Sequence, residues 1–232
     1  TANNAFHINK VLPFAKNARV IRNGIDTETF QPRQKKELRK KLLLEEDKKI
    51  VLFVGWLVER KGIKYLIEAI PWIIKEYNKV VFLLIGDGPL REVLEKKAEE
   101  KKIEAYVQFL GKKTQSEVAE YMAAADIFVL PSLYEGMPNV VMEAFSSGLT
   151  AVATDVCGTS EVVEDKKNGL LIRSENSKEL AEGITLLLKN EELRKKYSKE
   201  ARTTIKKLQL TWEKCATLHK KLYEEILKEK KN

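Results

Sequence analysis

The stretch "IVLFVGWLVERKGIKYLIEAIPWIIKEYNKVVFLLIG", residues 50–86, decides the fold. It opens with an apolar run that ends at Gly55, continues through an amphipathic stretch from Ile63 to Glu76, and closes with a second apolar run that starts at Val80. An apolar run without alternation is typical of a strand that is buried on both faces. Strand, helix and strand in this order indicate a parallel sheet covered by helices, so we predict a β–α–β unit here.

The same alternation continues toward the C-terminus. Further strands are predicted at Tyr106–Gly111, Asp126–Pro131, Thr150–Thr154 and Gly169–Ile172. Further helices are predicted at Leu90–Lys101, Ser116–Ala125 and Asn139–Ser147, with a short one at Ser160–Glu164. The fold class is therefore α/β, with a Rossmann-like, doubly wound parallel sheet of about six strands.

Three helical stretches without a strand follow the sheet, at Ser177–Lys189, Glu191–Lys207 and Thr211–Lys230. Thr211 suits an N-cap, and apolar residues recur after it at helical spacing. This apolar stripe along the helix must be buried against another surface. It either closes the core of this domain or reaches across to a neighbouring domain, and the sequence favours neither.

The N-terminal part is predicted to be a connection, because Asn23, Gly24 and Pro32 mark turns around one short strand-like run. We divide the chain into an arm over residues 1–32, a domain over residues 33–210 and a C-terminal helix over residues 211–232.

Charge and composition exclude several classes of protein. The net charge of the 232 residues is +8, but residues 1–49 carry +6 of it and the remainder only +2. A nearly neutral body without interleaved aromatic residues disfavours a nucleic-acid module. No apolar run approaches the roughly 20 residues of a membrane helix, and the start lacks the pattern of a signal peptide. We expect no transmembrane span and a cytoplasmic location.

Metal and disulfide chemistry are also disfavoured. The two cysteines, Cys157 and Cys215, form no CxxC motif, and the two histidines, His7 and His219, have no metal-ligand spacing. We therefore predict no metal site and no bound cofactor.

Two cations stand at the end of the first predicted strand. Arg60 and Lys61 come directly before a helix that begins near Gly62. Positive side chains beside the unpaired N–H groups of a helix start suit a phosphate or a diphosphate. Solvated surface charges are an equally good interpretation of these two residues taken alone.

Two glutamates flank a later helix start. Glu135 precedes Pro138, which suits the first helical position, and Glu143 lies more than one turn inside the helix. Five helical residues rise about 7.5 Å, so with the loop the carboxylates should exceed the roughly 5–9.5 Å of a glycosidase pair. A hydrolytic pair is therefore disfavoured. Carboxylates beside a phosphate site should accept from sugar hydroxyls, although a turn acceptor and a polar helix position remain alternatives.

Eight motifs occur along the chain in a fixed order, from about Val20 to Leu227: "NGIDTETFQP", "FVGWLVERKG", "LLIGDGPL", "VQFLG", "YMAAADIFVLPSLYEGMPNVVMEA", "GLTAVATDVCGTSEVV", "NGLLI" and "TWEKCATLHKKLYEEIL". This series resembles the donor-binding half of the family 4, or group 1, retaining glycosyltransferases. The resemblance implies one Rossmann-like half of a GT-B fold. It also implies a missing N-terminal domain that binds most of the acceptor, and a last helix that crosses back toward it.

The resemblance also implies roles for individual residues. Glu135 lies beside the hydroxyls of the transferred sugar, close to the reacting carbon, and Glu143 accepts from the ribose diol. Lys61 contacts phosphate, and Gly111 and Lys112 border the base. The loop and helix start that serve the sugar and the distal phosphate are Gly136, Met137, Pro138, Asn139 and Val140.

One position departs from the family pattern. The family commonly has an arginine directly after the first-strand glycine, and this chain has Trp56 there. Either Arg60 supplies that charge from a shifted position, or donor binding is weaker, or a different donor is used. The sequence leaves these three explanations open.

The leading hypothesis is the donor-binding domain of a retaining hexosyltransferase that uses a UDP, GDP or ADP sugar. Its acceptor is a saccharide, a lipid or a small molecule, and the domain alone is expected to turn over little or nothing. The missing domain could bring the protein to a membrane surface. The alternatives are a nucleotide-binding subunit of a split enzyme, a GT-B epimerase, and a phosphorylase, for which no cofactor-anchoring lysine can be placed.

Overall fold

The computed structural model describes residues 19–229. The first 18 residues of the predicted arm, which include His7, and the last three residues of the chain lie outside the described part. Among the described residues, no helix combines the length and the apolar character that a membrane crossing requires.

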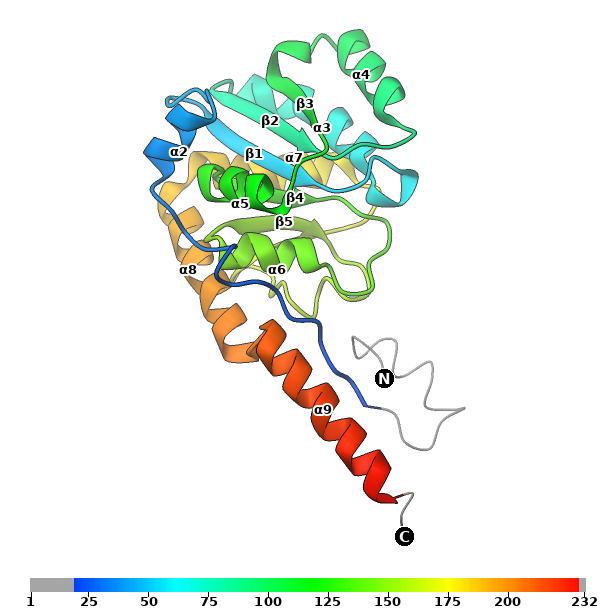
Figure 1. Ribbon diagram of the computed structural model, residues 1–232. Helices are drawn as coiled ribbons and strands as arrows, with labels where there is room; N and C mark the ends of the chain where they lie inside the picture. The colour runs from blue at the N-terminus through cyan, green and yellow to red at the C-terminus, as the bar shows by residue number, and fades with distance from the viewer. Residues whose placement is uncertain (1–18, 230–232) are drawn as a thin grey trace.

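The sheet has six parallel strands in the order β3-β2-β1-β4-β5-β6, so the predicted fold class is confirmed (Figure 1). β1 pairs with β2 on one side and with β4 on the other, which is the point where the strand order reverses. Every strand lies where a strand was predicted: β1 Lys49–Val54, β2 Val80–Ile85, β3 Val107–Gly111, β4 Ile127–Leu130, β5 Thr150–Thr154 and β6 Gly169–Ile172.

Helices cover both faces of the sheet. α3 and α7 pack against each other behind the sheet in Figure 1, and α5 and α6 lie in front of it. α2 packs on α5, and α8 packs on α6 and β5. The bounds are α2 Lys35–Lys41, η1 Glu59–Lys61, α3 Ile63–Glu76, α4 Arg91–Glu100, η2 Glu104–Tyr106, α5 Gln115–Ala124, α6 Asn139–Ser146, α7 Ser177–Lys189, α8 Glu191–Leu208 and α9 Trp212–Glu229.

The prediction of a short helix at Ser160–Glu164 is wrong. The segment forms turns instead, and Cys157 before it has a positive φ of 34°. The N–H of Glu164 donates to the side-chain oxygen of Asn168 at 2.8 Å rather than to a helical carbonyl. A side-chain acceptor that competes for backbone N–H groups favours turns over helix.

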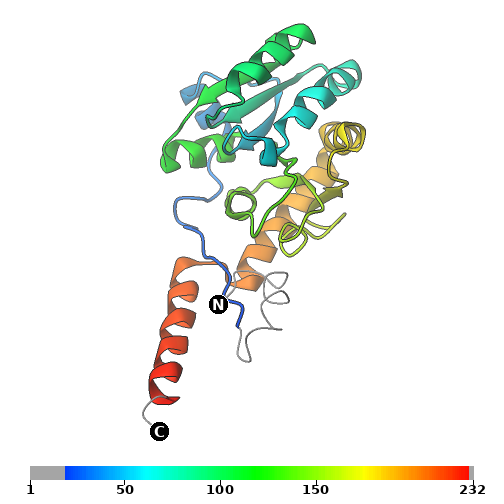
Figure 2. The ribbon, with the colours of Figure 1, turned by 90° about the vertical axis from the view of Figure 1, so that its right-hand side faces the viewer.

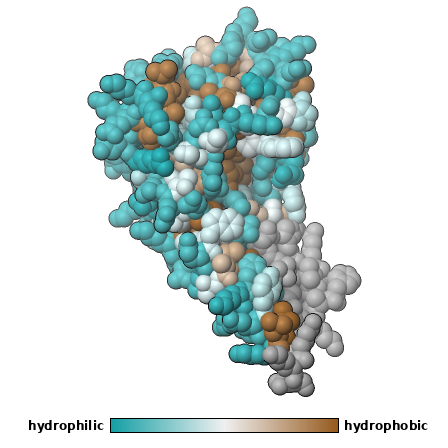
Figure 3. Space-filling model, viewed as in Figure 1, coloured by the Kyte–Doolittle hydropathy of each residue, from teal (hydrophilic) through white to brown (hydrophobic). Residues whose placement is uncertain are grey.

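The C-terminal helix α9 extends away from the rest of the chain (Figure 2). Its base is held to the arm, because the N–H of Ile25 donates to the carbonyl of Leu210 at 3.1 Å. Cys215 is buried near this base, whereas Trp212 and Ile226 from the same predicted stripe are exposed. Hydrophobic residues reach the surface near the far end of α9 (Figure 3). Most of the stripe therefore does not close the core of this chain, and a crossing to another domain stays a prediction.

A buried ion pair ties α2 to the amino-end edge of the sheet. The Arg39 guanidinium lies 2.6 Å from the Asp126 carboxylate, and both residues are buried. Lys35 lies 3.0 Å from the same carboxylate, which also accepts from the N–H of Ile50 at 2.8 Å. Burial acts to raise the pKa of Asp126. The two cations and the backbone donor outweigh burial and hold that pKa below its ordinary value of 3.8.

We expect Arg39→Met to lower the free energy of unfolding by about 3–5 kcal/mol, because it leaves a buried carboxylate without its closest partner. The matched control on the same helix is Lys41→Met. It removes an exposed contact with Glu120 and should cost less than about 1 kcal/mol. Urea unfolding measures both values.

The pH dependence of the free energy of unfolding tests the same ion pair. Because the pKa of Asp126 is lowered in the folded state, its stabilisation is present above the unfolded value of 3.8 and is lost as the pH falls through the folded value. Equal stability of the two variants would contradict the assigned role of the pair.

Candidate functional site

The loops that follow β1 and β4 meet at the carboxyl-end edge of the sheet. Gly62 adopts a φ of +62°, and a Cβ on it would lie 2.0 Å from the carbonyl oxygen of Pro131. The N–H of Leu133 donates to the carbonyl of Arg60 at 2.8 Å, and the Arg60 guanidinium donates to the carbonyl of Tyr134 at 3.2 Å. The two loops are therefore joined backbone to backbone, and they bring η1 beside the start of α6.

Glu135 is held at the centre of this junction and is only 6% exposed. Its Oε1 lies 2.5 Å from Lys61 Nζ and accepts from Ser132 Oγ at 2.7 Å. Its Oε2 lies 3.7 Å from Arg60. A buried carboxylate requires such compensation, and here two cations and a hydroxyl provide it. The turn-acceptor interpretation is insufficient, because the carboxylate itself pairs with the two predicted phosphate-binding cations.

The start of α6 faces the same junction. Its N-cap is Pro138, without a side-chain cap hydrogen bond, and the N–H groups of Asn139 and Val140 have no acceptor among residues 19–229. The Asn139 side chain accepts from Asn23 Nδ2 at 3.2 Å, which fixes it against the arm. Unpaired N–H groups at a helix start are the usual donors to an anion.

Glu143 lies half-buried in the second turn of α6. Burial raises its pKa to about 7. No hydrogen-bond donor or cation contacts its carboxylate within the described part of the chain. A carboxylate in this state gains most from a ligand that donates hydrogen bonds to it, because such donors favour the ionised form.

Most of the predicted site residues line one cavity of about 390 Å³. Trp56 stands at this cavity and is 67% exposed. Gly111 and Lys112 lie apart from it, at the end of β3, which is separated from β1 by β2. Neither Gly136 nor Glu143 lines the cavity, although both lie within a few residues of ones that do. The lining residues are Val54, Gly55, Trp56, Arg60, Lys61, Glu135, Met137, Pro138, Asn139 and Val140.

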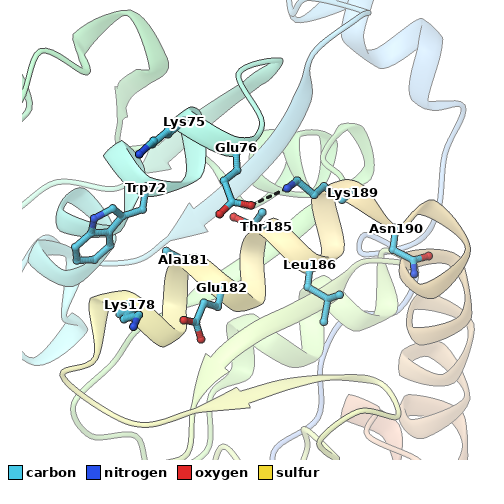
Figure 4. A pocket seen from close by; sticks show the side chains of 10 residues that line it. All are labelled: Trp72, Lys75, Glu76, Lys178, Ala181, Glu182, Thr185, Leu186, Lys189 and Asn190. Carbon is cyan, nitrogen blue, oxygen red and sulfur yellow. Dashed lines mark hydrogen bonds and ion pairs between the residues drawn. The ribbon is translucent and has the colours of Figure 1, made fainter.

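A larger cavity of about 820 Å³ lies between α3 and α7, and the loops that follow β1 and β4 do not line it (Figure 4). It is bordered by the exposed side chains of Trp72 and Leu186, and an ion pair between Glu76 and Lys189 at 2.6 Å crosses it. None of the predicted site residues lines it. The cations and the carboxylate that can bind phosphate and hydroxyl groups line the smaller cavity, which is therefore the candidate site.

Two residues of the site were not predicted from the sequence. Ser132 donates to Glu135, and its own carbonyl accepts from Thr154 Oγ1. Asn23 orients Asn139 from 116 positions away. The sequence offered a signal only for Ser132, which is a polar residue directly after the predicted strand Asp126–Pro131.

Comparisons with known proteins bear on the family and the fold of the chain. The family model described as "Glycosyl transferases group 1" matches residues 34–204. The uncharacterized glycosyltransferase MJ1178 of Methanocaldococcus jannaschii is 36% identical over 207 residues, which are 89% of this chain and 53% of that protein. The UDP-Gal:alpha-D-GlcNAc-diphosphoundecaprenol alpha-1,3-galactosyltransferase of Escherichia coli is 35% identical over 159 residues, 66% of this chain and 40% of that protein.

Among solved structures, sucrose-phosphate synthase of Thermosynechococcus elongatus matches with a TM-score of 0.88 and 27% identity. The match covers 97% of this chain and 57% of that one. The chain thus spans about half the length of the curated relatives it matches.

Two glycines with nearly the same positive φ test the loop junction. Gly62 and Gly111 have φ values of +62° and +67°, but a Cβ on Gly111 meets only the tip of the Arg91 side chain at 3.4 Å. We expect Gly111→Ala to cost about 1–2 kcal/mol for the left-handed conformation alone. Gly62→Ala should cost several kcal/mol, since it also drives a carbon into the Pro131 carbonyl. Urea unfolding compares them, and equal costs would show that the two loops do not approach as described.

Proposed function

Because the chain belongs to the glycosyl transferases of group 1, the family that its motifs resemble, we propose that it binds a nucleotide-sugar donor at the cavity beside η1 and α6. The whole protein then transfers the sugar to a saccharide, a lipid or a small molecule, with retention of the anomeric configuration. The chain described here supplies the donor half of that reaction. We expect it to bind the donor and to turn over little without the part that its relatives have in addition.

The observation that carries this proposal is that Lys61 lies at the same cavity as the N–H groups of Asn139 and Val140, which have no acceptor among residues 19–229. A side-chain cation and a helix start together favour the two negative phosphates of a nucleoside diphosphate. Arg60 stands at the rim with its guanidinium exposed and adds a second positive charge.

Glu135 is proposed to hold the sugar. Its carboxylate lies 2.5 Å from Lys61, so a sugar attached to a phosphate on Lys61 would lie within reach of the same carboxylate. A diphosphate that attracts Lys61 would free Oε1 to accept from sugar hydroxyls. In the transfer, the bond between the anomeric carbon and the diphosphate oxygen breaks and a bond to the acceptor oxygen forms. The proton of the acceptor hydroxyl passes to the departing diphosphate.

The donor site is proposed to act by stabilising the negative charge that develops on the departing diphosphate. Lys61, Arg60 and the start of α6 stabilise that charge, as fixed donors do in transferase sites generally. These groups are proposed to balance the charge of the diphosphate without a metal ion, so the proposal includes no metal and no other cofactor.

Glu143 is proposed to accept from the ribose diol, because its carboxylate is half-buried and lacks a protein donor among residues 19–229. Gly111 and Lys112 at the end of β3 are proposed to border the base. The sheet order supports an extended ligand across this edge, since β1 and β2 separate the sugar end at β4 from the base end at β3. A relative that uses UDP-galactose makes a UDP sugar the first donor to test, ahead of GDP and ADP sugars.

Trp56 changes the chemistry of the rim. An exposed indole stands where the family pattern has an arginine, and Arg60 on η1 points its charge toward Glu135 from four positions further on. We propose that Arg60 supplies the second cation, which is the first of the three explanations that the sequence left open.

Calorimetric titration with UDP-glucose tests the proposal. We expect binding by the chain, and Lys61→Met should weaken it about tenfold or more, since a charge-assisted hydrogen bond contributes about 1.5–3 kcal/mol. UDP alone, GDP and ADP follow as competitors. Absence of binding by all of these ligands to a folded sample would overturn the proposal.

The same titration against pH tests Glu143. The ribose diol favours the ionised carboxylate, so affinity should rise with pH through a value of about 7 and then level off. Below that value, affinity should fall by at most about tenfold per pH unit. Glu143→Gln should remove this pH dependence and leave the weaker affinity. A wild-type profile that is flat across the same range would show that Glu143 does not accept from the ligand.

A further inference from the structure

A second polar cavity, of about 510 Å³, opens at the amino-end edge of the sheet. Its floor includes Ala125, directly before the residue that leads into β4, and Leu149, directly before β5. The candidate donor site follows the other end of β4, and four strand residues span about 13 Å. The two cavities are therefore on opposite edges, and the second one is not a part of the donor site.

Cations dominate the lining of this amino-edge cavity. One stripe on α8 consists of Lys195, Lys199, Arg202 and Lys206, whose spacing of three and four places them on one face of the helix. The opposite wall carries Arg33 and Lys35. No aspartate or glutamate of the described part of the chain lines the cavity.

Half of these cations already have carboxylate partners. Lys35 pairs with Asp126 at 3.0 Å, Lys195 with Glu191 at 2.9 Å, and Arg33 lies 3.9 Å from Glu120. Lys199, Arg202 and Lys206, in contrast, have no ion-pair partner within residues 19–229. Six cations therefore line one hollow with no acidic residue in its described lining, and the three without a partner leave it with an excess of positive charge.

The ends of two helices reduce this excess without cancelling it. α5 and α6 both end at the cavity, and each helix C-terminus contributes about half a negative charge. Three unmatched side-chain cations exceed that sum. The net field in the cavity therefore remains positive and favours an anion.

Arg202 is positioned to act as the centre of this site. Its Cδ lies 3.9 Å from the position of a Cβ on Gly148, so the stem of the side chain rests on the cavity floor. Ser198, one turn earlier on α8, donates to the Gly148 carbonyl and fixes the helix against that floor. A guanidinium anchored in this way, with a lysine on each side, matches the oxygens of a phosphate group.

We propose that the amino-edge cavity binds a phosphate-bearing ligand through Lys199, Arg202 and Lys206. The phosphate belongs either to a soluble phosphorylated molecule or to the headgroup of an anionic lipid. In the second case the cavity would hold the protein at a membrane surface through this domain. The inference does not depend on the nucleotide-sugar proposal, because it uses none of the same residues.

NMR titration with inorganic pyrophosphate tests the soluble source. We expect saturable shifts of the Gly148 and Leu149 amide signals, separate from any shifts at the donor cavity. The triple variant Lys199→Ala, Arg202→Ala and Lys206→Ala should bind at this cavity at least tenfold more weakly. The matched control is the double variant Lys196→Ala and Lys207→Ala, which removes exposed cations of α8 that do not line the cavity and should leave the shifts unchanged.

Vesicle sedimentation tests the lipid source, with phosphatidylcholine alone compared with phosphatidylcholine mixed with phosphatidylglycerol. Binding to the mixed vesicles that the triple variant loses and the control variant keeps would support a headgroup ligand. Circular dichroism confirms that each variant is folded. If pyrophosphate leaves Gly148 and Leu149 unshifted, and anionic vesicles bind all variants equally or none, the proposed site is overturned.

Discussion

The parallel pairing of β1 with β4 is the constraint on which the rest of the structure depends. Val51 pairs with Ile127 and Leu52 with Phe128, although more than 70 residues separate the partners. β2 and β3 extend the sheet from β1, and β5 and β6 extend it from β4. The connections that leave β1 and β4 therefore run over opposite faces of the sheet. The loops at the carboxyl ends of these two strands diverge and leave a crevice between them. η1 and the start of α6 reach the same cavity only because of this pairing.

The charges at the crevice fit the proposal that one site serves both an anion and neutral hydroxyl groups. Glu135 is buried and needs cations, and Lys61, only partly accessible, provides the closest one. A phosphate needs the same lysine. We therefore propose that an arriving diphosphate divides the ion pair between Lys61 and Glu135, with the cation going to phosphate and the carboxylate to sugar. On this account, the ion pair keeps both groups in place until the ligand replaces each partner.

The sequence predicted the framework well because buried parallel strands and amphipathic helices leave strong periodic signals. "IVLFVG" and "VVFLLIG" are continuous apolar runs, and they became the two neighbouring strands β1 and β2. Ser160–Glu164 was wrongly predicted because the decisive acceptor, Asn168, lies outside the segment. The contact of Asn23 with Asn139 and the amino-edge cavity depend on distant segments meeting, and no local pattern indicates such meetings. The residue roles and the division into arm, domain and crossing helix stay predictions.

A crystal structure of the chain with UDP-glucose tests the central claim most directly. The account predicts the diphosphate between Lys61 and the N–H groups of Asn139 and Val140, the glucose hydroxyls at Glu135, and the ribose at Glu143. It also predicts a longer distance between Lys61 and Glu135 than the 2.5 Å of the present structure. A nucleotide bound between α3 and α7, or one that leaves the ion pair intact with its phosphates in solvent, would contradict the account.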